Sequence, residues 1–181
     1  MGGGATSCSN GSDDPTPDNN ENVTPPTEDK EVIDLSKLNS WWEGGFEVEH
    51  TTASAIIKVT GQGKDYVQYA KLCGADISFN NKNKATLKVK NNDTKEAYVK
   101  IDIKSDSNGS AVTVATANGE DRDVQYGGAD MTIPTNGEAV FILTLDTSKN
   151  ADKFIVGLNN NGESAPSSGN ITISDAYLWK E

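Results

Sequence analysis

From residue 46 onward, short runs alternate between apolar and polar residues, and this period of two predicts β-strands. The clearest run is AYVKIDIKS at residues 97–105. Neighbouring side chains of a strand point to opposite faces, so its apolar members should face the core; they are Val99, Ile101 and Ile103. Its alternate members should face solvent; they are Tyr98, Lys100, Asp102 and Lys104.

Similar runs predict about ten more short strands, at residues 46–50, 54–61, 65–72, 76–80, 85–91, 110–117, 130–134, 138–146, 153–159 and 170–180. In the last run, a bulge near Ser174 and Asp175 would bring Ala176 and Leu178 to the core side. Stretches rich in Gly, Asn and Asp separate the runs, and no segment of ten or more residues has a helical period. We therefore predict an all-β fold, an antiparallel β-sandwich.

The first part of the chain has a different composition. Residues 1–35 contain eight acidic side chains, one lysine and four of the six prolines. They contribute −7 to the total charge of −11, which leaves −4 for the rest. Such a segment buries too little apolar surface to offset its chain entropy, so we expect residues 1–30 to be a disordered tether and residues 31–181 to form the sandwich.

Small residues precede Cys8 in GATSCSNGSDD, and acidic residues follow it. This stretch resembles the lipobox and export tail of Bacteroidetes-type surface lipoproteins, although MGGGAT has no basic and no apolar signal region. The resemblance implies lipidation at Cys8 and a secreted or cell-surface location. The alternative is a free cysteine in a disordered tail.

Several classes of function are disfavoured by composition. The acidic balance argues against nucleic-acid binding, and no run of eighteen apolar residues could span a membrane. One histidine, His50, and two cysteines, Cys8 and Cys73, exclude the usual His/Cys zinc sites. His50 also lacks a nucleophile-elbow motif, so we interpret it as a partly exposed strand residue. We expect a monomer without catalytic residues.

Exposed aromatic rings can bind the flat C–H faces of sugars, while polar side chains bind the hydroxyls around them. For each tyrosine the alternative is an amphipathic residue at the edge of the core. The candidate ligand-binding residues are Trp41, Trp42, Tyr66, Gln68, Tyr69, Tyr98, Lys100, Asp102, Tyr126 and Asn159. In the adjacent pair, strand parity with Phe46 favours Trp42 as the buried ring and Trp41 as the exposed one; a bulge at Gly44–Gly45 would reverse this.

Four stretches resemble jelly-roll carbohydrate-binding modules of the family-four, family-sixteen and family-twenty-two type. They are GGFEVE at 44–49, GADISFNNKNKATLKVKN at 74–91, FILTLDTSKNADKFIVGLNNNG at 141–162 and SGNITISDAYL at 168–178. The resemblance covers residues 44–181 and implies that the sandwich is a β-jelly roll that binds polysaccharide without catalysis. It also implies a structural calcium ion held by Glu47 and Asp175, although two carboxylates alone are too few ligands.

The sequence leaves two other functions open. The first is a surface adhesin or structural sandwich that binds protein. The second is a small polysaccharide-degrading enzyme, which would need two facing carboxylates, for example Asp102 and another acid, with one pKa raised.

Overall fold

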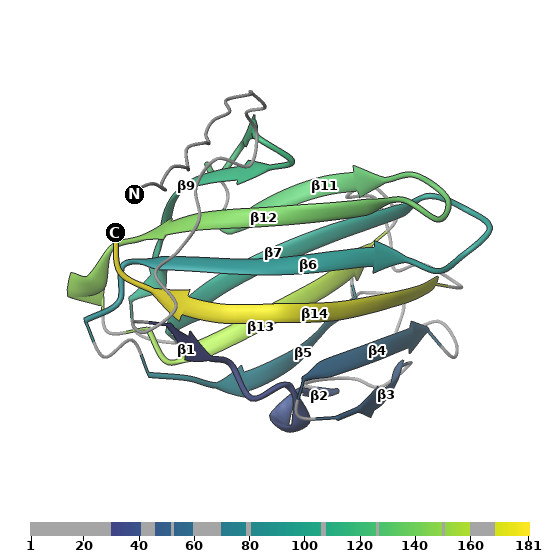
Figure 1. Cartoon of the computed structure of the whole chain (residues 1–181), viewed down its shortest axis with the longest axis horizontal. Coiled ribbons are helices and arrows are strands. Elements are labelled where there is room, and N and C mark those ends of the chain that lie inside the picture. The colour runs from purple at the N-terminus through teal and green to yellow at the C-terminus, as the bar shows by residue number, and fades with distance from the viewer. Residues whose placement is uncertain are drawn as a thin grey trace, which may run out of the picture.

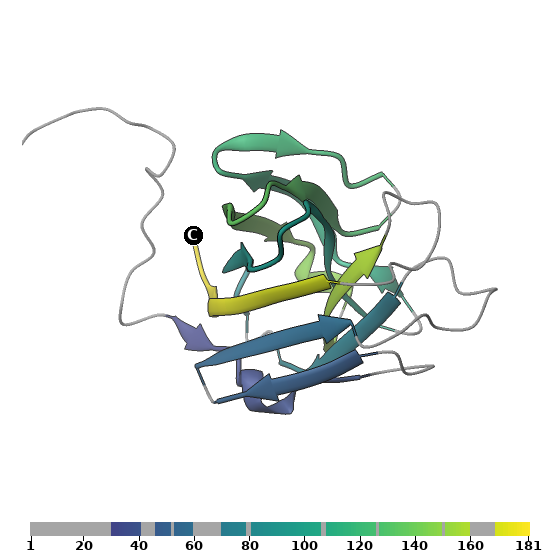
Figure 2. The same ribbon diagram turned by 90° about the vertical axis from the view of Figure 1, so that its right-hand side faces the viewer.

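The computed structural model of the chain describes residues 30–40, 46–51, 53–59, 70–78, 81–105, 108–125, 127–149, 151–159 and 169–181. Its strands form two antiparallel sheets that face each other (Figures 1 and 2). The strands of the eight-stranded sheet are β1 (Glu31–Val32), β3 (Phe46–His50), β4 (Ser54–Val59), β6 (Lys84–Asn91), β9 (Val112–Ala117), β10 (Glu120–Arg122), β12 (Glu138–Leu145) and β14 (Gly169–Trp179). The strands of the six-stranded sheet are β2 (Asn39–Ser40), β5 (Ala70–Asp76), β7 (Ala97–Ser105), β8 (Gly109–Ser110), β11 (Ala129–Ile133) and β13 (Lys153–Asn159).

The chain passes repeatedly from one sheet to the other. The order in the larger sheet is β10-β9-β12-β6-β14-β4-β3, with β1 also on β14. The order in the smaller sheet is β11-β7-β13-β5-β2, with β8 also on β7. The two described helical segments, η3 (Leu35–Lys37) and η4 (Thr147–Lys149), are single 3₁₀ turns. No helix in the described ranges is long and apolar enough to cross a membrane. The predicted antiparallel β-sandwich is confirmed.

The core lies between the sheets and is built by the alternation that the sequence shows. Burial along β7 alternates at every residue, and Val99, Ile101 and Ile103 are fully buried. Among the described residues, Phe141 of β12 and Phe154 of β13 are the largest fully buried side chains. The apolar period of two therefore fixes which face of each strand turns inward.

The predicted bulge in β14 is confirmed. The pairing with β6 shifts between Ser174 and Tyr177, and Ala176 and Leu178 are buried. Asp175 has a φ of 52° and is exposed. Since two residues of the bulged strand oppose one on the partner, the inward face is restored after the bulge.

The prediction of separate strands at residues 65–72 and 76–80 is wrong where the structure describes them. One strand, β5, runs through Gly74 to Asp76, and Ile77 and Ser78 follow it outside any strand. Gly74 pairs with Ile155 of β13, which keeps the backbone in the sheet. The short strands β1, β2, β8 and β10 carry too few residues for a periodic signal and were not predicted.

Candidate functional site

The outer side of β11, β7 and β13 brings several predicted ligand residues together; we call it the six-stranded face. Register places its residues in rows across the three strands, because paired residues lie side by side. Thr132, Tyr98 and Asn159 form one row, and Asp130, Lys100 and Gly157 the next. The face continues with Asp102 opposite Ile155 and Lys104 opposite Lys153.

Tyr98 is held in place by a polar cluster at the β11 edge of this face. Its hydroxyl donates a hydrogen bond to the Asp130 carboxylate, and the ring is only partly exposed. Burial raises the pKa of the Tyr98 hydroxyl, and the bond to Asp130 raises it further. Arg122 of β10 donates through Nε to the Asp130 carbonyl at 2.8 Å. The cluster thus presents an aromatic ring, a carboxylate and a guanidinium close together.

Sequence reasoning did not identify Asp130 and Arg122 as site residues. The alternation in DMTIP places Asp130 on a polar face but does not show which strand lies beside it. β7 and β11 pair although β8, β9 and β10 lie between them in the chain. Arg122 is the only arginine of the chain, which is the one signal that could have drawn attention to it.

Asp102 holds β7 to its neighbours. Its Oδ1 accepts from Ser110 Oγ at 2.6 Å and from the Ile103 backbone N–H at 2.8 Å. Ser110 Oγ in turn accepts the backbone N–H groups of Val112 and Gly128 at 3.1 and 3.2 Å. Burial raises the pKa of Asp102, while these hydrogen bonds and two nearby lysines act to lower it. These bonds give Asp102 a structural role in addition to its place on the face.

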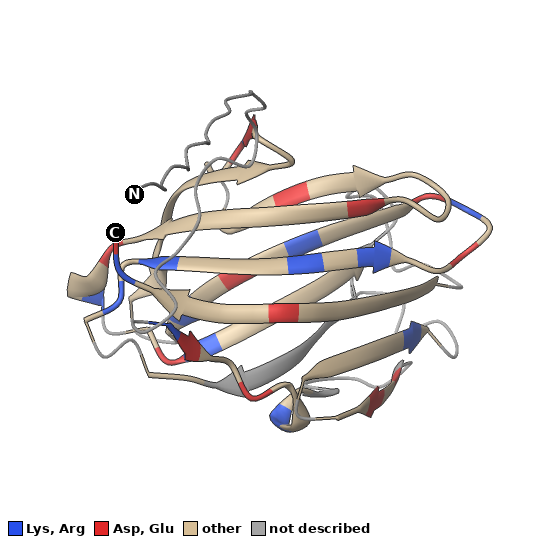
Figure 3. Ribbon diagram, viewed as in Figure 1, with Lys and Arg blue, Asp and Glu red and all other residues tan. Residues whose placement is uncertain are grey.

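At the centre of the face, Gly157 has no side chain, and Ile155 is paired with Asp102. Ile155 is 9% exposed, yet it is not part of the core cluster. The register places Lys100 opposite Gly157 and Lys104 opposite Lys153, and Figure 3 shows basic positions along β7 and β13. A small apolar centre with polar neighbours suits a ligand that has both kinds of surface.

The structure does not bring together the two residues predicted to hold calcium. Glu47 pairs with Lys58 of β4, whereas Asp175 follows Ser174, which pairs with Ser54. Four residues along β4 separate these positions by about 13 Å, too far for two carboxylates to share one ion. Within the described residues, no group of three or more His, Cys, Asp or Glu side chains could hold a metal ion. Asp175 instead lies 3.7 Å from Lys88 Nζ.

Several sequence predictions fall outside the described residues. These are the lipidation site Cys8 and the ligand candidates Trp41, Trp42, Tyr66, Gln68, Tyr69 and Tyr126. The side chain of Asn159 is also outside them, although its backbone belongs to β13. His50 is exposed and lies on β3, in line with its interpretation as a strand residue at the surface.

No family model and no curated protein sequence matches the chain. Among solved structures, the family 11 carbohydrate-binding module of the cellulase Lic26A-Cel5E from Clostridium thermocellum has a TM-score of 0.50 at 15% identity, covering 84% of this chain and 95% of the module. A family 11 module from Clostridium thermocellum in complex with a β-1,3-1,4-mixed-linked tetrasaccharide has a TM-score of 0.49 at 15% identity, covering 84% and 96%. A family 29 module has a TM-score of 0.48 at 15% identity, covering 82% and 86%. The chain shares the jelly-roll β-sandwich fold of the Lic26A-Cel5E module.

Proposed function

We propose that this chain binds a polysaccharide, without catalysis, across the six-stranded face. The observation that carries the proposal is the cluster of Tyr98, Asp130 and Arg122 on the same face as Ile155 and Gly157. A sugar ring offers a flat C–H face with hydroxyls at its rim, and this combination of groups matches both.

Preorganisation favours binding here. Asp130 orders the Tyr98 ring through its hydroxyl, and Arg122 fixes the β11 backbone that carries Asp130. Side chains that are ordered before the ligand arrives lose less conformational entropy when it binds. We therefore assign the Tyr98 ring to stacking, and Asp130, Arg122 and Lys100 to the sugar hydroxyls.

The hydrogen bonds of Asp102 support the absence of catalysis. A raised pKa is one requirement for a glycosidase acid, and Asp102 meets it. Its Oδ1, however, already accepts from Ser110 and Ile103, and that serine also anchors Gly128. This arrangement supports a role in holding strands together. The shared fold with a carbohydrate-binding module points the same way.

Isothermal titration of the full chain against mixed-linked β-glucan, xylan and mannan oligosaccharides tests the proposal. We expect at least one of them to bind, and Tyr98→Ala to weaken that binding about tenfold or more, since stacking and its buried area are lost. Tyr177→Ala is the matched control, because Tyr177 lies on the other sheet and should leave this binding unchanged.

Circular dichroism and the melting temperature would show that Tyr98→Ala still folds. Thr132→Ala is a second control for oligosaccharide binding. Thr132 is exposed in the same row and only borders the ring, so its loss should affect binding less than the loss of Tyr98. Binding of none of the oligosaccharides, or binding that is equal in Tyr98→Ala and wild type, would contradict the proposal.

A further inference from the structure

The outer side of the eight-stranded sheet has a hollow of its own, on the opposite side of the sandwich from the six-stranded face. The hollow has a volume of about 450 Å³ and lies where β1, β14, β6 and β12 meet. The residues that line it and carry the argument are Lys30, Val32, Lys88, Val140, Asp175 and Tyr177. Its volume is within the range of small-molecule sites.

The bulge in β14 builds this hollow. Asp175 turns outward at the bulge, and Tyr177, two residues later, pairs with Thr86 of β6 and Val32 of β1. Tyr177 and Val32 therefore lie side by side on the outer surface, with Ile142 of β12 beyond Thr86 in the same row. The row is largely apolar, with the Thr86 hydroxyl between Tyr177 and Ile142.

Exposed apolar side chains gather on this side of the molecule. In the described part of the chain, the large hydrophobic residues that remain exposed are Val32 at 60%, Val114 at 54% and Val140 at 39%. Val32 and Val140 line the hollow, and Val114 pairs with Thr144 on the same outer surface. Exposed apolar groups that collect on one face rather than being scattered indicate a contact surface.

Charged side chains also line the hollow. Lys30 Nζ lies 4.7 Å from the centroid of the Tyr177 ring. Lys88 Nζ lies 3.7 Å from Asp175 Oδ2, longer than a good charge-assisted hydrogen bond, and its side chain is 37% exposed. Among the described residues that line the hollow, two carry ammonium groups and one carries a carboxylate, although the whole chain is acidic. Figure 3 shows the basic positions along β6.

We propose that the hollow binds a carboxylated sugar, a hexuronate unit of an acidic glycan. The apolar C–H face of the sugar would lie on Tyr177 and Val140, and its carboxylate would lie between Lys30 and Lys88. Lysine is depleted at the centre of protein–protein interfaces, so a protein partner fits this lining less well. The excess of ammonium groups favours an acidic sugar over a neutral one. This site does not depend on the ligand of the six-stranded face.

Trigalacturonate and galactotriose provide the test, because they differ at C6 by the carboxylate. Titration of the full chain should show one site for trigalacturonate, with galactotriose at least tenfold weaker. Tyr177→Ala and Lys88→Gln should each weaken trigalacturonate binding about tenfold. Lys88 is on the surface, so Lys88→Gln tests the site even if Tyr177→Ala does not fold. Tyr98→Ala is the matched control and should leave trigalacturonate binding unchanged.

Three results would each overturn the proposal: no binding of trigalacturonate, equal affinity for the two trisaccharides, or trigalacturonate binding that Lys88→Gln does not weaken. Loss of trigalacturonate binding in Tyr98→Ala would assign this sugar to the six-stranded face and would overturn it too. Failure of neutral oligosaccharides to bind concerns only the six-stranded face, so the two hypotheses fail separately.

Discussion

The two outer faces of the sandwich present their aromatic rings in different ways. On the six-stranded face, Tyr98 is ordered by a hydrogen bond to Asp130. On the eight-stranded sheet, Tyr177 contacts the exposed side chain of Lys30 through a cation–π interaction, which is worth about 0.5–1 kcal/mol at an exposed site. A ring fixed by a polar neighbour suits one preferred ligand geometry, whereas a ring beside a long, movable lysine can adjust.

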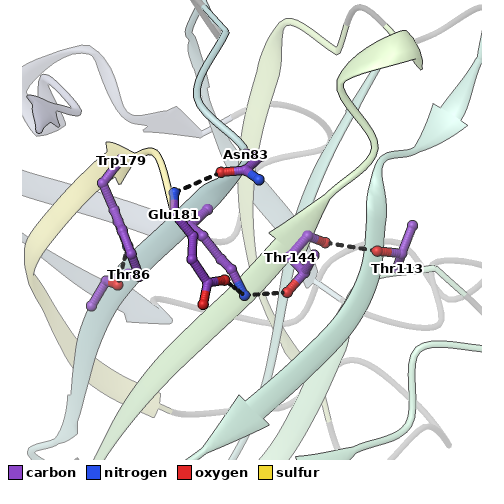
Figure 4. Close-up of polar contacts among 7 residues, drawn as sticks. Asn83, Thr86, Thr113, Thr144, Trp179 and Glu181 are labelled. Carbon is purple, nitrogen blue, oxygen red and sulfur yellow. Dashed lines mark hydrogen bonds and ion pairs between the residues drawn. The ribbon is translucent and has the colours of Figure 1, made fainter. Parts of the chain in front are cut away.

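Each face also carries one cluster whose role is structural. On the six-stranded face it is Asp102 with Ser110 and Gly128. On the eight-stranded sheet it is the network of Figure 4, where Trp179 Nε1 donates to Thr86 Oγ1 at 2.9 Å. Lys84 extends that network to Thr144 and Glu181, both at 2.9 Å. Polar groups on an outer face are therefore not all available to a ligand, because some are already used in hydrogen bonds that hold the strands together.

The largest effect should come from Gly128→Ala on the six-stranded side. Gly128 has a φ of +77°, and an added Cβ would lie 2.5 Å from the Ile101 carbonyl oxygen and 2.9 Å from Asp102 Cβ. Left-handed strain and the clash together should lower the free energy of unfolding by about 3 kcal/mol. Urea unfolding measures this loss.

Gly109→Ala is the matched control for that variant. Gly109 has a φ of +72°, but an added Cβ would meet nothing within 4 Å. Only the backbone strain remains, so the loss should be about 1 kcal/mol. Equal losses in the two variants would show that the close approach of Gly128 to β7 does not constrain the fold.

A smaller loss should follow Thr86→Val on the eight-stranded sheet. Both partners of the Trp179–Thr86 hydrogen bond are buried, and valine leaves the indole N–H without its acceptor. The expected loss is about 2 kcal/mol in the free energy of unfolding. Thr86→Ser keeps the acceptor and should retain most of the stability. If valine and serine were equivalent, the bond would contribute little.

These clusters also show what the sequence could and could not predict. The alternation in residues 97–105 placed Tyr98, Lys100 and Asp102 on one outer face, since a period of two is a local property. The bulge at Asp175 was also predictable, because Ala176 and Leu178 would otherwise have faced solvent.

The residues that lie beside these side chains on neighbouring strands could not be predicted, because they depend on strand pairing between distant segments. Asp130 reaches Tyr98, and Gly128 reaches Ser110, only after β11 pairs with β7. The same limitation affected the prediction that Glu47 and Asp175 hold a calcium ion. Each was placed on a plausible strand, but the register of β3, β4 and β14 keeps them apart.

The smallest of the three effects is a change in pH dependence at Asp102. Burial raises the pKa of this carboxyl above 3.8 in the folded state. Its contribution to stability is therefore fully present below the unfolded pKa and is lost as the pH rises through the folded pKa. Asparagine can accept the same two hydrogen bonds but does not titrate. The stability of Asp102→Asn relative to wild type should accordingly increase from acidic to neutral pH in urea unfolding.

The stability of Asp146→Asn relative to wild type should change with pH in the opposite direction. Asp146 also accepts from a serine, Ser148, but it is not buried, and these hydrogen bonds lower the pKa of Asp146. Its contribution is present above the unfolded pKa and is lost as the pH falls through the folded pKa. Relative to wild type, Asp146→Asn should therefore lose stability as the pH rises. Parallel pH curves for the two variants would show that burial does not distinguish the carboxyl of the six-stranded face from an exposed one.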